Sequence, residues 1–156
     1  MNQIRRQTLQ AGGSAGLLAV LVAAGLVRPG EARAADWNEA AFTQKSLGDA
    51  LKALNAGGAA VSGAVQIRAP EIAENGAVVP IAIDSKLPGT QWIALLIEKN
   101  PQPLAASFDI PAGTEPAIST RVKMGQSSDV IALVKADGKF YTAKKEIKIT
   151  LGGCGG

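Results

Sequence analysis

The residues best suited to chemistry lie near the C-terminus, where the chain's single cysteine stands between two pairs of glycines: Gly152, Gly153, Cys154, Gly155 and Gly156. Glycine has no side chain and the widest backbone freedom, so this pattern predicts a slender, flexible arm that carries a thiol. Five extended residues span about 17 Å, which is enough to enter a narrow cleft of another protein. Residues 152–156 are therefore the candidate site, and Cys154 is its candidate point of covalent attachment.

The composition gives Cys154 no chemical partner within the chain. The 156 residues include no histidine and one cysteine. Without histidine there is no Ser-His or Cys-His nucleophile pair and no imidazole ligand for a metal. One cysteine forms neither an intrachain disulfide nor a structural zinc site. We therefore expect no catalytic residue, no metal and no cofactor, and a thiol whose chemistry is performed by other enzymes.

Three lysines, Lys144, Lys145 and Lys148, precede the arm in the sequence. They could attract an anionic group carried on Cys154, because opposite charges attract at short range. The alternative is that they only solvate the exposed face of a strand.

Residues 1–34 have the organisation of an export signal. Arg5 and Arg6 precede an uncharged stretch, residues 11–27, and a small-residue cleavage site ends at Ala34. The uncharged stretch contains four glycines and is short for a membrane-spanning helix, which needs about 20 apolar residues. We expect cleavage after Ala34, export from the cytoplasm and no stable membrane association.

The paired arginines indicate the route of export. Arg5 and Arg6, followed by Leu9, resemble the twin-arginine signal, although Thr8 and Gln10 depart from its usual residues. An ordinary secretory signal with two chance arginines is the alternative. The prediction is a periplasmic protein exported by the twin-arginine pathway.

The basic charge of the whole chain comes from this signal. The formal net charge is +3, but four of the 16 basic residues and one of the 13 acidic residues precede Ala35. The remaining chain has 12 of each and is formally neutral. Only 4% of the residues are aromatic, so there is little to stack on bases. We expect no nucleic-acid ligand.

Residues 35–58 are predicted to form an N-terminal amphipathic helix and a Gly-Gly linker. Apolar residues recur at three- and four-residue steps from Asp36 to Ala56, with an interruption expected near Gly48. Gly57 and Gly58 then end the helix.

Residues 59–151 have the pattern of short strands separated by turns. Apolar and polar residues alternate, and turn pairs such as Asn75-Gly76 and Asp137-Gly138 lie between the runs. This spacing predicts a mostly β domain, an immunoglobulin-like antiparallel β-sandwich. The expected strands are 61–69, 78–84, 90–98, 105–110, 117–124, 130–135, 140–143 and 146–151.

Two of these strands are apolar on both faces. Residues 92–97 and 130–134 show no alternation. Either the helix of the same chain covers their second face, or a partner subunit docks there.

The arm resembles that of the SoxY family, the sulfur carriers of the bacterial thiosulfate-oxidising Sox system. The resemblance extends to residues 69–76 with Val79-Pro80, to residues 98–101, and to the Asp137-Gly138 hairpin before the last strand. It implies an immunoglobulin-like sandwich that forms a heterodimer with a SoxZ-like subunit, which would account for the doubly apolar strands.

The resemblance also implies a sequence of reactions on Cys154. The haem protein SoxAX would join thiosulfate oxidatively to the thiol, giving a cysteine S-thiosulfonate. SoxB would hydrolyse off sulfate, and sulfane dehydrogenase, where present, would oxidise the remaining sulfur. The chain would be a carrier acted on by these enzymes, with sulfur intermediates held covalently on a swinging arm.

Two other functions remain open from the residues. A ubiquitin-like sulfur carrier also ends in Gly-Gly and forms a terminal thiocarboxylate, but it works in the cytoplasm with ATP, and Cys154 would be superfluous. An exported immunoglobulin-like binding module could dimerise through an intermolecular disulfide at Cys154. The flanking glycines are poorly suited to presenting such a fixed interface.

Overall fold

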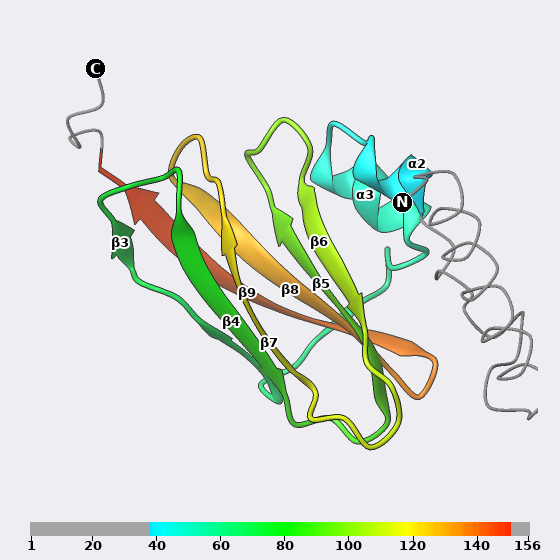
Figure 1. Ribbon diagram of the computed structural model, residues 1–156. Coiled ribbons are helices and arrows are strands. Elements are labelled where there is room, and N and C mark those ends of the chain that lie inside the picture. Colours follow the sequence, from blue (N-terminus) through cyan, green and yellow to red (C-terminus); the bar gives the residue numbers. More distant parts are fainter. Residues whose placement is uncertain (1–37, 151–156) are drawn as a thin grey trace, which may run out of the picture. The chain divides into compact units, whose positions relative to one another are not determined.

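The computed structural model describes residues 38–150, and residues 1–37 and 151–156 lie outside the described part (Figure 1). The predicted export-signal residues Arg5 and Arg6 are therefore outside it, as are the arm residues 152–156. The domain boundaries expected after Ala34 and at Leu151 also fall there and remain predictions.

Two short helices stand where one was expected. They are α2 (Glu39–Phe42) and α3 (Leu47–Ala53), so the expected helical segment is present and its interruption divides it into two helices. The interruption lies before Ser46, whose side chain accepts a hydrogen bond from the amide of Asp49 and begins α3. Gly48 is inside α3 and does not interrupt it. The helix ends before the Gly-Gly pair, because Asn55 has a left-handed backbone conformation (φ 56°).

The described residues contain nine strands in two sheets. One sheet has the order β1-β9-β8-β5-β6 with β3 paired to β9, and the other has the order β2-β4-β7. The prediction of a mostly β, immunoglobulin-like sandwich is confirmed; β1 and β3 depart from its antiparallel pattern by pairing parallel to β9. The strands are β1 (Ala60–Val61), β2 (Val65–Arg68), β3 (Ile72–Ala73), β4 (Val79–Ser85), β5 (Thr90–Ile97), β6 (Leu104–Asp109), β7 (Ala117–Val122), β8 (Ser128–Ala136) and β9 (Lys139–Ile149).

Three strand predictions need correction. The expected strand 61–69 is divided between β1 and β2, which belong to different sheets. The expected strands 140–143 and 146–151 are one strand, β9, because β8 pairs with it continuously from Lys139 to Ile147. Strand β3 was not predicted, since two residues are too short to show a period.

The sandwich core explains the alternating strands. Alternate side chains of β4 and β5 pack between the sheets with those of β8, and Ile83, Leu95 and Val134 are fully buried there. Burial of these apolar side chains is the main stabilising contribution of the domain.

A second core answers the question posed by the doubly apolar strands. Leu96 of β5 and Leu133 of β8 are fully buried on the outer face of the sheet, where they pack with Ala41 of α2 and Ala50 of α3. Figure 1 shows both helices beside β5 and β6. The explanation that the chain's own helices cover these strands is therefore confirmed, and the same side chains are not available to a partner subunit.

Candidate functional site

Strand β9 is the element that positions the predicted arm. It runs for 11 residues and ends at Ile149, five residues before Cys154 in the sequence. Its two ends have different neighbours: the hairpin with β8 lies at Lys139, and β3 lies beside Lys148 and Ile149. Cys154 itself, like the four glycines of the arm, lies outside the described residues. The described part of the site is therefore the end of β9 and the residue after it, residues 148–150, which we call the root of the arm.

The root is hydrogen bonded on both edges. Toward β3, the amide of Lys148 donates to the carbonyl oxygen of Glu71 at 2.9 Å, and the amide of Thr150 donates to that of Ala73 at 3.2 Å. On the opposite edge, the amide of Ile149 donates to the hydroxyl of Ser127 at 2.9 Å. Three successive amides are thus held by protein partners up to the last described residue.

Loops at the same end of the sandwich are fastened to one another. The side-chain amide of Asn100 donates to the carbonyl oxygen of Lys123 at 2.8 Å, which joins the β5–β6 loop to the β7–β8 segment. The amide of Lys99 donates to the buried hydroxyl of Ser128 at 3.0 Å. The root of the arm therefore lies beside loops that are hydrogen bonded to one another, namely the β5–β6 loop and the segment between β7 and β8.

The three lysines before the arm have different surroundings. Lys144 forms an ion pair with Asp129, and the hydrogen bond and charge of that carboxylate raise the pKa of Lys144. The ammonium group of Lys145 donates to the carbonyl oxygen of Ala69 at 2.6 Å. Lys148 is exposed and forms no ion pair within the described residues. Within residues 38–150, Lys148 is thus the one of the three whose ammonium group has neither an ion pair nor a hydrogen bond.

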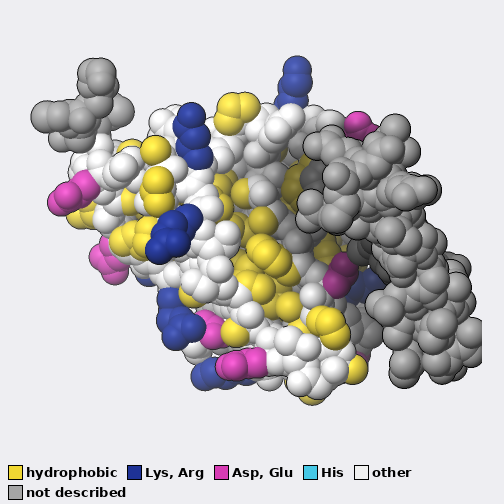
Figure 2. Space-filling model, in the orientation of Figure 1, with side chains coloured by type: hydrophobic (Ala, Val, Ile, Leu, Met, Phe, Trp, Pro, Cys, Tyr) yellow, Lys and Arg dark blue, Asp and Glu magenta, His cyan; other side chains and the backbone are white. Residues whose placement is uncertain are grey.

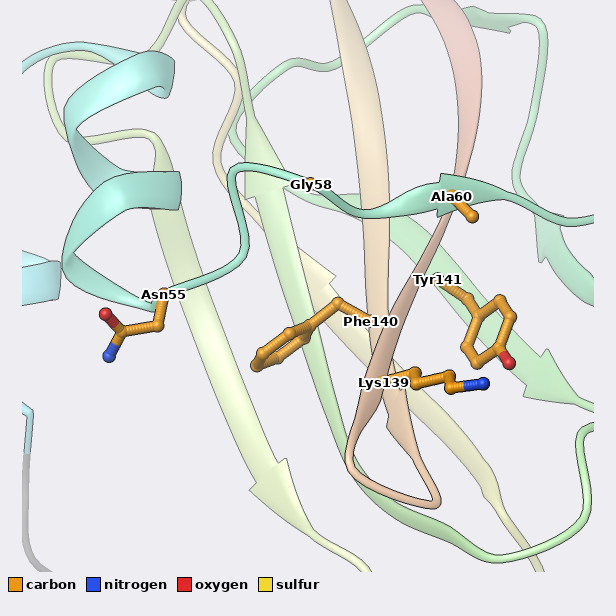
Figure 3. Close-up of a pocket in the computed structure, with 6 residues that line it drawn as sticks. All are labelled: Asn55, Gly58, Ala60, Lys139, Phe140 and Tyr141. Carbon is orange, nitrogen blue, oxygen red and sulfur yellow. The ribbon is translucent and has the colours of Figure 1, made fainter.

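A shallow pocket lies at the other end of β9. Figure 3 shows Phe140 and Tyr141 pointing to opposite sides of the strand. The ring of Phe140 meets that of Trp92 edge to face, with 6.3 Å between their centres, and Lys135 lies 5.7 Å from the centre of the Phe140 ring. The pocket is far along β9 from the root and contributes nothing to it. Its lining residues are Asn55, Gly58, Ala60, Lys139, Phe140 and Tyr141.

A second pocket lies beside the C-terminal end of β9, and its lining residues are Glu71, Ile72, Lys145, Glu146 and Lys148. Basic and acidic side chains are interspersed over the face in Figure 2, without one continuous basic stripe. Within residues 38–150, no group of three or more acidic, cysteine or histidine side chains could hold a metal ion. No helix in this range is long and apolar enough to cross a membrane.

The sequence interpretation missed Ser127 and β3. Ser127 lies 22 residues before Ile149, so no local periodicity connects them. The only sequence indication was the polar segment before β8, which is typical of an ordinary turn.

Comparisons with known proteins agree with this arrangement. The family model described as sulfur oxidation protein SoxY matches residues 51–154, a range that reaches Cys154. A solved structure of the sulfur carrier protein SoxY from Chlorobium limicola f thiosulfatophilum is 38% identical and has a TM-score of 0.62. The alignment covers 72% of this chain and 99% of that one. No curated protein matches.

A second solved structure shares only the fold. The superoxide reductase (neelaredoxin) from Ignicoccus hospitalis is 19% identical, with a TM-score of 0.50 over 55% of this chain and 79% of that one. The SoxY family model, in contrast, matches well over half of the chain. A carrier role, and not that of an enzyme, follows from this family. The chain belongs to the SoxY family of sulfur carrier proteins.

Proposed function

We propose that this chain is a periplasmic carrier that holds sulfur intermediates covalently on Cys154 during the oxidation of thiosulfate. The observation that carries the proposal is the family match over residues 51–154, which includes the cysteine. The root at Ile149 and Thr150 supports it, because a strand anchored on both edges gives the following residues a fixed point from which to reach other proteins.

The proposed loading step is an oxidation at sulfur. The Cys154 thiol loses its proton, a bond forms between its sulfur and the terminal sulfur of thiosulfate, and an electron pair passes to the haem protein SoxAX. The product is a cysteine S-thiosulfonate. The sequence contains no histidine, so in this proposal the enzyme supplies the base that accepts the thiol proton.

The following steps also take place in partner enzymes. In SoxB, water attacks the sulfonate sulfur, sulfate leaves, and a persulfide remains on Cys154. Sulfane dehydrogenase, where present, then oxidises the remaining sulfur. The glycines on both sides of Cys154 support this scheme, because they leave the cysteine room to enter several different clefts.

The proposal includes a heterodimer with a SoxZ-like subunit. Such a partner must bind elsewhere than on the outer faces of β5 and β8, because α2 and α3 of this chain cover them. Export by the twin-arginine route, which carries folded cargo, would allow the two subunits to cross the membrane together. Fusion of residues 1–34 to a reporter that is active only after twin-arginine export tests this route, with Arg5→Lys plus Arg6→Lys as the variant expected to abolish it.

Removal of Gly155 and Gly156 tests the attachment site against the thiocarboxylate alternative. Under the proposal, a chain that ends at Cys154 still gains a thiosulfate-derived mass when incubated with thiosulfate and the cognate oxidase. A chain with the complete arm and Cys154→Ala gains none. The reverse pattern, with loss of the adduct on the shortened chain and retention in Cys154→Ala, would favour chemistry at the terminal carboxylate.

A further inference from the structure

The hydroxyl of Ser127 occupies the place of a missing backbone partner at the end of β9. Strand β8 begins at Ser128, which is paired with Ile147. Extending this register by two residues would place Gln126 opposite Ile149. The side chain of Gln126 instead donates to the carbonyl oxygen of Lys99 at 3.4 Å, as part of the loop that leads away from β9.

The hydroxyl group of Ser127 is a hydrogen-bond partner for both the amide and the carbonyl oxygen of Ile149. The hydroxyl oxygen accepts a hydrogen bond from the Ile149 amide at 2.9 Å, and the O–H group donates to the Ile149 carbonyl oxygen at an oxygen–oxygen distance of 3.5 Å. A hydroxyl is both a donor and an acceptor, so it can stand in for the peptide group of a neighbouring strand. The pairing of β9 is thereby extended beyond the first residue of β8.

The other edge of the root alone is a weak support. Strand β3 has only two residues, Ile72 and Ala73. On this edge the amide of Thr150 donates to Ala73 of β3, and the amide of Lys148 donates to Glu71, the residue before β3. Pairing this short is marginal in water without further strands. Ser127 adds a hydrogen bond to Ile149 on the opposite edge, between the two residues that are bonded on the β3 side.

We propose that Ser127 is a positioning residue for Cys154, because it holds the root in place up to Thr150, the residue from which the cysteine is tethered. From Thr150, Cys154 is four residues away, a reach of about 13 Å. If the hydrogen bonds of residues 148–150 were lost, the last held residue would be Ile147, which is paired with β8. The tether to Cys154 would then have seven residues and a reach of about 23 Å. The effective concentration of the thiol in a docked enzyme would then fall about twofold, since it varies with roughly the −3/2 power of tether length.

Hydrogen exchange of the complete mature chain tests the structural half of this proposal. Ser127→Ala is expected to speed exchange of the Ile149 amide about fivefold, because one net hydrogen bond is lost. Ser127→Thr keeps the hydroxyl and should exchange like the wild type, and so should Ser119→Ala, which removes an exposed hydroxyl from β7. Unchanged exchange at Ile149 in Ser127→Ala would overturn the proposal. Equal acceleration throughout β9 would also do so, because it would indicate a general loss of stability.

The rate of loading tests the functional half, which rests on the proposed carrier role of Cys154. Ser127→Ala is expected to lower the initial rate of oxidase-dependent thiosulfate loading by up to about twofold, the limit reached when the end of β9 is open in every molecule, while the thiol reacts with a small disulfide reagent at the wild-type rate. Three glycines inserted between Gly153 and Cys154, with Ser127 retained, lengthen the tether in every molecule and should lower loading by about twofold while exchange at Ile149 stays unchanged. Wild-type loading by Ser127→Ala, despite faster exchange, would overturn the positioning role. If the wild type itself forms no adduct, the carrier function fails, and the exchange data still decide whether Ser127 holds the root.

Discussion

The carbonyl oxygen of Gly76 accepts a hydrogen bond from the amide of Met124 at 2.7 Å, and the two backbones leave no space for a side chain between them. A Cβ atom on Gly76 would lie 2.5 Å from the carbonyl oxygen of Met124 and 3.1 Å from Cγ2 of Ile149. This contact joins the turn before β4 to the segment after β7, directly beside the root of the arm. A glycine is required here because of the close approach.

Substitution of this residue tests the contact. Gly76→Ala should lower the free energy of unfolding by about 1–3 kcal/mol, because backbone atoms must shift to admit the methyl group. Gly125→Ala is the matched control: its Cβ would meet open space, and the expected change is within about 0.5 kcal/mol. Urea unfolding of the mature chain measures both. Equal stabilities for the two variants would show that the Gly76 contact is not tight in solution.

The cover that α2 and α3 provide for β5 leads to a second prediction. Leu96 is fully buried in the cluster beneath the helices, so Leu96→Ala should cost about 2–5 kcal/mol in the free energy of unfolding. Val61→Ala, at a side chain that is 87% exposed, should change little. The measurement uses this chain without any partner. A Leu96→Ala effect that appeared only in the presence of a partner subunit would contradict cover by the chain's own helices.

The first turn of α3 should show a pH dependence in the acid range. A hydrogen bond from Ser46 and the charge of Lys52, 3.5 Å away, hold the pKa of Asp49 below its ordinary value of 3.8. A carboxyl group whose pKa is depressed in the folded state stabilises it above pH 3.8, and this contribution is lost as the pH falls through the lower folded-state value. Asp49→Asn should therefore melt below the wild type at pH 7.

The difference between the two melting temperatures should shrink as the pH is lowered below 3.8, since the wild-type carboxyl group then also becomes neutral. Thermal unfolding followed by circular dichroism between pH 7 and pH 2 measures it. A constant difference over this range would indicate that the charge of Asp49 does not contribute to the stability of the folded state.

The sandwich could be predicted from the sequence because its longer strands carry a clear period of two. In β4, Val79, Ile81 and Ile83 face the core, while the residues between them are less buried. The division of the N-terminal helix and the existence of β3 could not be predicted in this way. A cap at Ser46 and a two-residue strand at Ile72–Ala73 are decided by local hydrogen bonds and by a distant partner strand.

In the candidate site, too, one part could be predicted from the sequence and another part depends on the fold. Cys154 stood out because composition and spacing are properties of the sequence itself, and the family match extends to it. The contact between Ser127 and Ile149 joins residues that only the folded β8–β9 pair brings together. Periodicity also could not decide what covers the doubly apolar strands, since a helix and a partner subunit require the same apolar surface.

The most direct test of the carrier role is the intact mass of the mature protein after incubation with thiosulfate and the cognate haem oxidase. The prediction is one added mass that corresponds to a cysteine S-thiosulfonate, located on Cys154 by fragmentation and absent from Cys154→Ser. A reductant should remove this mass, because the adduct is joined through a sulfur–sulfur bond. An unmodified Cys154 while the oxidase reduces its electron acceptor with thiosulfate would contradict the account.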